Sequence, residues 1–393
     1  MKKSASCFRL GCLGLGLAGL LIAAGLFLAI NAWPSLGAQG ADFLRGLVGD
    51  EPVAQLEIGY YSLNDTLQGW IYGSGLRQPS APWQPPTSIP AVVAAAPVLQ
   101  ATAAPLQHPL QSAPIIDAGE LHPLPPLGML KGEGLWSVYI QDAAGHPLAY
   151  RTFLQPDPGR PYAVVAVVAF DLGRTRLHFV LGSYEPYAPK APARSGAMPV
   201  ADKAAGTLVA MFNGGFKGRH GHFGAMAGQV VALPPITGLG TLVIYADGHL
   251  ALGEWGNEIR PSADMLAWRQ NGPLVIRHGQ INPQVDNNSP QDWGYTVDSV
   301  APTWRSGLGL SADARMLYYF CGSSLSMDAL AKSMQAAGAE NAIQLDINTF
   351  WVHFVAVHPD GTLEALFPAM MNEDLGRYLS PYSRDFFYVT AAR

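Results

Sequence analysis

Charged residues and cysteines are scarce in this chain. Only 13% of its 393 residues are charged and 49% are apolar, which excludes a mostly disordered chain and allows one large or two ordinary globular domains. Of the three cysteines, Cys7 and Cys12 fall within residues 1–35, so Cys321 stands alone in residues 36–393. A disulfide within residues 36–393 is therefore excluded, and this part must be stabilised by packing.

Basic residues are in the minority as well. The first 35 residues hold three Lys and Arg and no Asp or Glu, so the remainder has 21 basic against 29 acidic residues, a formal charge of −8. An acidic surface argues against nucleic acid as a general partner, and we expect none. We also expect no cofactor. His220 and His222 have a spacing that could ligate a metal, but they lack partner ligands in the sequence, so a divalent metal is unsupported.

An uncharged apolar run extends from Leu10 to Ile30, after Lys2, Lys3 and Arg9. Its length is about that needed to cross a hydrocarbon core of about 30 Å. Positive charge before the run, and no A-x-A cleavage pattern after it, favour an uncleaved membrane anchor with the rest of the chain outside the cytoplasm. The alternative is a cleaved signal peptide, which would make the chain secreted.

The composition changes again before the globular part. Twelve prolines stand between Pro79 and Pro126 among Ala, Gln and Ser, and charges almost vanish there. Because proline stiffens the chain and cannot donate to a strand ladder, we predict a semi-rigid spacer, with loops packed on the main domain as the alternative. The predicted order is a membrane anchor, a membrane-proximal segment with helical patterns, the spacer and one domain, at residues 1–35, 36–75, 76–129 and 130–393.

Strand patterns dominate after residue 130. Stretches rich in β-branched and apolar residues recur between short turns, and we expect residues 162–172 and 176–184 to pair as neighbouring strands. One clear helix is indicated, with Ser326 to cap its start and Gly338 to end it. We therefore predict an α+β fold, a strand-rich domain with a mixed β-sheet and a few helices, preceded by the transmembrane helix and the Pro-rich spacer.

The predicted helix separates two apolar strands that end at Cys321 and Asp346. If these strands are parallel, a right-handed crossover places both ends at one edge of the sheet, where ligands of open α/β sheets bind. Asp346 is therefore the leading candidate for a site residue. Cys321 is better explained as a small buried hydrophobe, because no base or cation stands near it in the sequence.

A Gly-rich loop follows another predicted strand in "MFNGGFKGRHGHFGAM", residues 211–226. Glycines let backbone N–H groups approach an anion closely, and Lys and Arg supply positive charge. A phosphate or sugar-phosphate site is the functional interpretation, and an ordinary hairpin loop is the alternative. The candidate residues here are Asn213, Gly214, Gly215, Lys217, Arg219 and His220.

Two further segments offer polar candidates. Arg305 precedes a Gly-flanked strand, where its guanidinium could bind phosphate oxygens, or pair with a carboxylate for structural reasons. Asn271 could donate hydrogen bonds to ligand hydroxyls, although an Asn-Gly turn commonly exists for backbone reasons. Both are kept as candidates for a site.

Four short motifs occur in an order that resembles the phosphodiester glycosidase family. They are "FNGGFK", "NGPLV", "WRSGLG" and "AGAENAIQLD", and the resemblance begins at about Leu130. In that family the Asp is usually followed by Gly-Gly-Gly-Ser-Ser, whereas Asp346 is followed by "INTFW". Ligand contacts made by the Gly-Ser turn therefore do not carry over, and Asn348 is the polar candidate in its place.

The resemblance implies hydrolysis of a bond between sugar C1 and a phosphodiester oxygen. With the predicted membrane anchor, we expect the substrate to be an envelope glycan or a related molecule. Arg305 and Lys217 would hold the phosphate, and Asn213 would orient the sugar or the phosphate. Asp346 would activate water or stabilise an oxocarbenium-like centre. The alternatives are a noncatalytic protein that binds glycan or cell-wall polymer, and a factor in exopolysaccharide assembly.

Overall fold

The computed structural model describes only part of the chain. The described residues are 21, 24–85, 121–287, 289–293 and 299–392. Most of the apolar run from Leu10 to Ile30 and the centre of the predicted spacer lie outside them. Within the described ranges, no helix combines the length and the hydropathy that a membrane crossing requires. The chain divides into two compact units, Met1–Tyr60 and Tyr61–Arg393.

Two helices occupy the segment predicted to be helical near the amino end. They are α2 (Pro34–Val48) and α3 (Asp50–Gly73), and α3 continues into the second unit. Pro34 opens α2, where its missing N–H costs nothing because the first turn has no acceptor for it. In the first unit the buried Arg45 pairs with Asp42 at 3.3 Å and also with Glu57. The helical patterns read from residues 36–75 are thus confirmed.

The largest sheet has eight strands, in the order β1-β2-β3-β14-β13-β15-β11-β12. Its strands are β1 (Ser137–Gln141), β2 (Pro147–Leu154), β3 (Val165–Asp171), β11 (Leu274–Arg277), β12 (Gln280–Ile281), β13 (Thr303–Ser311), β14 (Met316–Leu325) and β15 (Ala339–Ile347). Neighbouring strands are antiparallel throughout. The predicted α+β, strand-rich character is confirmed, but this sheet is antiparallel instead of mixed.

Two five-stranded antiparallel sheets complete the strand structure. One has the order β17-β16-β5-β18-β4 and the other β7-β6-β10-β8-β9. The first contains β4 (Thr175–Val180), β5 (Leu208–Asn213), β16 (Phe354–Val357), β17 (Leu363–Ala365) and β18 (Phe386–Ala391). The second contains β6 (Ala225–Ala227), β7 (Val230–Leu233), β8 (Gly240–Tyr245), β9 (Leu250–Glu254) and β10 (Met265–Gln270).

The predicted pairing of residues 162–172 with 176–184 is wrong. β3 pairs with β2 and β14 in the large sheet, whereas β4 pairs with β18 in a five-stranded sheet. Every residue of β3 is buried, so both of its edges and both of its faces are covered. The short turn between these strands therefore takes the chain from one sheet to another, which a local pattern does not reveal.

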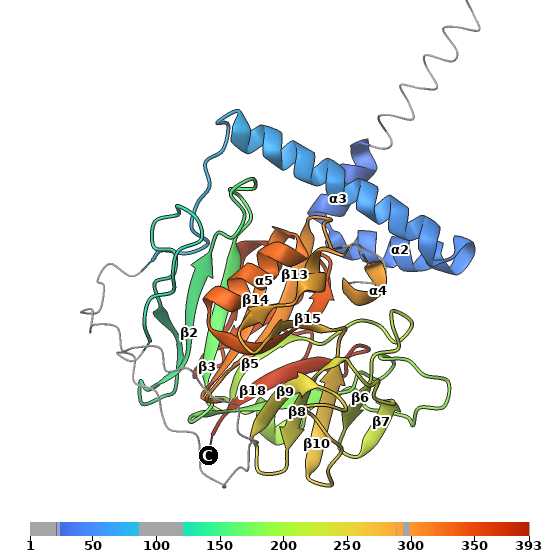
Figure 1. Cartoon of the computed structure of the whole chain (residues 1–393), viewed down its shortest axis with the longest axis vertical. Helices are drawn as coiled ribbons and strands as arrows, with labels where there is room; N and C mark the ends of the chain where they lie inside the picture. Colours follow the sequence, from blue (N-terminus) through green and yellow to red (C-terminus); the bar gives the residue numbers. More distant parts are fainter. Residues whose placement is uncertain (1–20, 22–23, 86–120, 288, 294–298, 393) are drawn as a thin grey trace, which may run out of the picture. The chain divides into compact units, whose positions relative to one another are not determined.

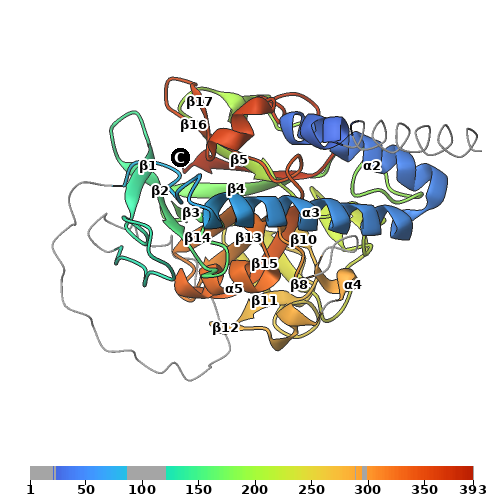
Figure 2. The same cartoon turned by 90° about the horizontal axis from the view of Figure 1, so that it is seen from above.

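Helix α5 (Met327–Ala336) forms where the sequence predicted it. The Ser326 hydroxyl accepts a hydrogen bond from the Ala329 N–H at 3.2 Å, and Gly338 follows the helix with φ +79°. β14 and β15 point the same way, because each is antiparallel to β13, which lies between them. Figures 1 and 2 show α5 against these strands. β14 continues to Leu325, so Cys321 lies inside the strand and not at its end.

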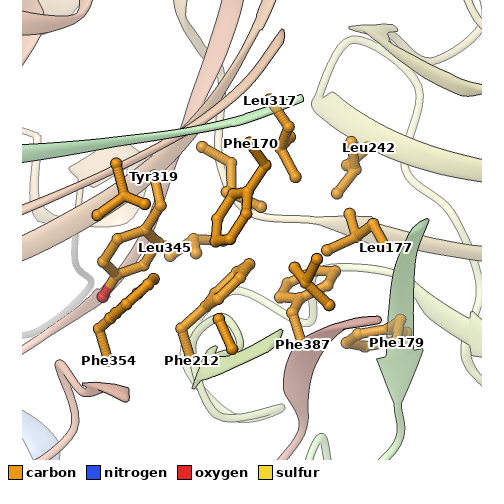
Figure 3. Packing of buried hydrophobic residues seen from close by; sticks show 14 of the residues in the cluster. Phe170, Leu177, Phe179, Phe212, Leu242, Leu317, Tyr319, Leu345, Phe354 and Phe387 are labelled. Atoms are coloured by element: carbon orange, nitrogen blue, oxygen red, sulfur yellow. The ribbon is translucent and has the colours of Figure 1, made fainter. Parts of the chain in front are cut away.

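Aromatic side chains fill the space between the large sheet and the sheet that contains β5 (Figure 3). The ring of Phe212 on β5 lies 5.9 Å from Phe354, 6.4 Å from Phe170 and 4.8 Å from Tyr319, measured between centroids. Leu345 of β15 is fully buried in the same cluster. This core fixes the carboxyl ends of β5 and β15 relative to each other.

The described ends of the predicted spacer contact the domain. Trp83 meets the edge of Phe153 at 5.7 Å, and the Arg151 guanidinium lies 4.7 Å from the centroid of the Trp83 ring. Three leucines pack against the core beside α5: Leu121, Leu124 and Leu127. Residues 86–120, between these two ends, lie outside the described part of the chain.

Candidate functional site

Asp346 lies near the end of β15, and only 5% of its surface is exposed. The register of β15 against β13 is irregular just before it. Gly307 is opposite Gln344, but Arg305 is opposite Ile347, so β15 contains one extra residue in this stretch. A bulge of this kind changes the direction of the side chains beyond it. The bulge therefore determines on which face of the sheet the Asp346 side chain lies.

Arg384 is the cation that contacts this carboxylate. Its Nη2 lies 2.5 Å from Oδ2 of Asp346, and both side chains are buried. The Trp351 ring stacks on the Arg384 guanidinium at 4.2 Å and on the Lys217 ammonium at 4.9 Å, measured to the ring centroid. One carboxylate and two cations thus gather beside one indole ring.

The surroundings of Asp346 shift its pKa. Burial raises the pKa of Asp346 to about 6, because the ionised form loses hydration. Arg384 and Lys217 lower that pKa, and the nearby carboxylate of Asp385 raises it. Asp346 is therefore mostly ionised at neutral pH and retains a useful affinity for a proton, as a general base requires.

Asn213 joins two sheets behind the carboxylate. Its Nδ2 donates to Ser306 Oγ at 3.0 Å, and Ser306 Oγ donates to the backbone carbonyl of Asp346 at 2.8 Å. The Tyr319 hydroxyl donates to Asn213 Oδ1 at 2.8 Å. The structure thus brings Asn213 close to Asp346, but Ser306 connects it to the backbone carbonyl of Asp346 and not to the carboxylate. Both ends of the Asn213 amide are bound by the protein, which makes it a positioning residue in this geometry.

The Gly-rich loop closes on a carboxylate of the protein itself. The N–H groups of Gly214 and Gly215 donate to the carbonyl oxygen and to Oδ2 of Asp385, each at 3.1 Å. The N–H of Phe216 donates to Asn271 Oδ1 at 2.9 Å, and a Cβ on Gly215 would lie only 2.5 Å from that oxygen. The predicted use of these N–H groups as a cradle for a ligand phosphate does not fit, because protein oxygens already accept from them.

Asn271 and Arg269 hold this loop against the large sheet. Asn271 Nδ2 donates to the carbonyls of Gln344 and Leu345, each at 2.8 Å. Arg269 is fully buried, and its Nε donates to Asp385 Oδ2 at 2.8 Å. Asn271 therefore has a structural role in this geometry, since its amide connects the loop to the strand that ends near Asp346.

The structure does not bring Arg305 to the Asp346 carboxylate. Arg305 and Gly307 lie two residues apart on β13 and share one face of the sheet, where a Cβ on Gly307 would clash with Met334 of α5. The guanidinium of Arg305 is fully buried and donates to three backbone carbonyls, those of Leu325, Trp293 and Ala301. The predicted phosphate contact of Arg305 therefore does not fit its position.

The other predicted candidates lie in turns. Arg219 is exposed and donates from Nε to Nε2 of the buried His220 at 3.3 Å. Asn348 has φ +84°, accepts from the Phe350 N–H at 2.9 Å and donates to the Tyr61 hydroxyl at 3.0 Å. Asn348 thus shapes the turn after β15. In the described ranges, no three His, Cys, Asp or Glu side chains are grouped so that they could hold a metal ion.

Arg384 and Asp385 were missed by the sequence analysis. They stand directly before the apolar strand β18, and they reach the site because β18 pairs with β5. A signal was present, since a charge next to a buried strand is the pattern that singled out Asp346. Ser306 carries no comparable signal, because a serine within a strand is common.

Residues 206–346 match the family model described as phosphodiester glycosidase (NAGPA). Among solved structures, the catalytic domain of zebrafish N-acetylglucosamine-1-phosphodiester alpha-N-acetylglucosaminidase, auto-inhibited by its pro-peptide, is similar at 13% identity over 66% of this chain and 88% of that chain, with a TM-score of 0.42.

Two further solved structures are similar. A hypothetical protein from Synechocystis is 10% identical over 68% of this chain and 64% of that chain, with a TM-score of 0.35. A putative exported protein from Burkholderia pseudomallei is 11% identical over 58% of this chain and 74% of that chain, with a TM-score of 0.30. No curated protein matches this chain.

The family match covers most of the residues that build the site. It includes the loop from Asn213 to Lys217, Asn271, and Asp346 at its last position, whereas Arg384 lies beyond it. The resemblance drawn from the four sequence motifs is confirmed over this range. Residues 206–346 of the chain therefore match the phosphodiester glycosidase family.

Proposed function

We propose that the chain is a hydrolase that cleaves the bond between the anomeric carbon of a sugar and an oxygen of a phosphodiester. The observation that carries this proposal is the buried Asp346 carboxylate with Arg384 at 2.5 Å and with Lys217, like Arg384, in contact with the Trp351 ring. Two cations suit an anionic diester, and a carboxylate suits the electron-poor C1. The family match supports the same class of reaction.

In the proposed reaction, Lys217 and Arg384 bind the phosphate oxygens. The C1–O bond breaks, and its electron pair remains on the oxygen of the departing phosphate monoester. Water adds its hydroxyl to C1 and gives its proton to Asp346, which later returns it to solvent. Because the leaving group is a stable anion, the step needs little protonation of that group, so one carboxylate with two nearby cations suffices.

The location of the substrate is part of the proposal. The predicted anchor in residues 1–35, with Lys2, Lys3 and Arg9 before its apolar run, supports a single-pass membrane protein with its main domain outside the cytoplasm. A glycan of the cell envelope with a sugar-1-phosphodiester linkage is the substrate class that this location favours. A membrane partner through the amino-terminal run follows from the same prediction.

Trp351 favours a second candidate function. Its ring contacts both cations, and it stands in the turn where the family usually has Gly and Ser. A bulky ring at that place restricts the approach of a substrate to Arg384 and Lys217. A protein that binds an anionic glycan without cleaving it is therefore the alternative, and hydrolysis decides between the two.

The test uses the purified chain and a panel of sugar-1-phosphodiesters, with release of reducing sugar as the readout. We expect Asp346→Asn to lower the rate about 10²- to 10⁴-fold, the usual contribution of a positioned general base. The matched control is Asp360→Asn, which changes an exposed carboxylate in the turn between β16 and β17. Circular dichroism checks that each variant is folded.

Two results would contradict this assignment. If Asp346→Asn hydrolyses the panel as fast as the unmodified chain, then Asp346 has no part in the chemistry. If the unmodified chain binds members of the panel and cleaves none of them, the binding function is correct and the hydrolase proposal is wrong.

A further inference from the structure

Two exposed tyrosines stack on each other in the loop after β4. Tyr184 is 56% exposed and Tyr187 is 44% exposed, and their ring centroids lie 4.9 Å apart with an angle of 19° between the planes. Stacking covers one face of each ring and leaves aromatic surface in contact with water. Exposed aromatic surface is costly to keep and commonly marks a binding site.

The backbone places this pair beside both cations of the site. The N–H of Tyr184 donates to the carbonyl of Ser383 at 3.1 Å, and Ser383 directly precedes Arg384. On the other side, a Cβ on Gly218 would lie 2.7 Å from the backbone nitrogen of Tyr187, and Gly218 directly follows Lys217. The tyrosines therefore lie next to the segments that present Arg384 and Lys217.

Two buried or half-buried charges keep the loop rigid. Glu185 Oε2 accepts from the N–H of Gly218 at 2.8 Å and from the N–H of Tyr187 at 2.7 Å. Arg194 donates to the carbonyls of Pro186 and Tyr184, at 3.1 Å and 2.5 Å. The backbone of the pair is thus fixed to the Gly-rich loop, so its rings form a preorganised surface.

We propose that Tyr184 and Tyr187 form a platform for a sugar ring of the substrate beyond the bond that is cleaved. The platform rests on the proposed function, and it narrows the substrate to a glycan of more than one sugar. The C–H face of a pyranose packs on an aromatic ring, and the tyrosine hydroxyls add polar contacts. Tyr184 and Tyr187 carry no charge, so they suit an uncharged sugar ring. Lys217 and Arg384 would bind the phosphate.

The first experiment measures binding of neutral oligosaccharides that contain no phosphate. Cellotetraose, maltotetraose and chitotetraose are titrated into the full chain by calorimetry. We expect one of them to bind, and the double variant Tyr184→Ala/Tyr187→Ala to bind it at least about tenfold more weakly. The double variant Tyr184→Phe/Tyr187→Phe keeps the rings and should retain most of the affinity. Tyr245→Ala, which removes a ring stacked on His249, is the control.

A kinetic experiment separates the platform from the proposed hydrolysis. The alanine variant should lose at least about tenfold in kcat/KM for an oligosaccharyl-1-phosphodiester and keep its value for the monosaccharyl substrate. Equal losses for both substrates, or no binding of any tetrasaccharide by the unmodified chain, would overturn the platform. Ring-dependent binding by a chain that hydrolyses nothing would uphold the platform and refute the hydrolase.

Discussion

At the residue scale, the proposed chemistry of the site depends on the charge of Asp346. Its pKa of about 6 lies above the usual value near 4, because burial penalises the ionised form. A base must be ionised to accept a proton, so kcat/KM should fall as the pH drops below about 6. Lys217 lowers this pKa by its positive charge. The acid limb of the pH profile therefore reports on both residues.

We predict that Lys217→Gln moves the midpoint of this acid limb to higher pH. Removing the cation withdraws a charge that stabilises the ionised carboxylate, so the pKa of Asp346 rises. The same change should lower kcat/KM about 10- to 100-fold at pH 8, since a charge-assisted phosphate contact is worth about 1.5–3 kcal/mol. Initial rates between pH 4.5 and 9 provide the measurement.

Lys332→Gln is the matched control for this prediction. Lys332 is half-exposed on α5 and pairs with Asp328, so its loss should leave the midpoint in place. A midpoint that stays at about 6 in Lys217→Gln, or moves to lower pH, would show that Lys217 has no electrostatic contact with the base.

The sequence identified some of these residues and could not identify others. Asp346 was found because a charge ends an apolar strand, and Lys217 because it stands in a Gly-rich loop. Arg384 is 38 residues beyond Asp346, and only the pairing of β18 with β5 places it at the site. The position of Arg305 away from the Asp346 carboxylate could not be predicted, because a bulge in β15 determines which side chains share a face with Asp346.

At the element scale, individual strands were predictable and their partners were not. The apolar patterns locate β5, β14 and the helix α5, because burial imposes these patterns locally. The assignment of β3 and β4 to different sheets depends on distant strands, which supply the hydrogen bonds. For the same reason β13, which separates β14 from β15, could not be placed between them from the sequence.

Two arginines test the corrected assignment of the elements. Arg305→Lys should lower the free energy of unfolding by roughly 2 kcal/mol, because lysine cannot reach all the carbonyls that the fork of Arg305 binds. Its kcat/KM should change less than about twofold. Arg384→Lys should instead lower kcat/KM about 10- to 100-fold, because the guanidinium contacts the base. Urea unfolding and initial rates give both quantities.

The reverse pattern would refute this assignment. If Arg305→Lys lost the activity at unchanged stability, Arg305 would contact the substrate, as the sequence motif suggested. Normal kinetics in Arg384→Lys would show that the reaction does not require the Arg384 guanidinium, and the proposed binding of phosphate by that guanidinium would be wrong.

At the scale of the whole molecule, all three sheets contribute to one site. Asp346 comes from the large sheet, Asn213 precedes the Gly-rich loop in a second sheet, and Arg269 belongs to β10 in the third. Arg269 and Asp385 form a fully buried ion pair at 2.8 Å that connects this third sheet to the segment before β18. The geometry around Asp346 therefore depends on contacts between sheets as well as on local turns.

A double-mutant cycle tests this connection. Arg269→Met and Asp385→Asn should each destabilise the fold by about 3–5 kcal/mol, because each leaves a buried charged partner uncompensated. The double variant should be more stable than the sum of these losses implies, by at least about 2 kcal/mol in urea unfolding. The control pair is Arg277→Met with Glu254→Gln, whose half-exposed ion pair should couple by less than about 1 kcal/mol. If the losses in the free energy of unfolding were strictly additive, the Arg269–Asp385 ion pair would not stabilise the contact between the sheets. Asp385 would then act only through its hydrogen bonds with the Gly-rich loop.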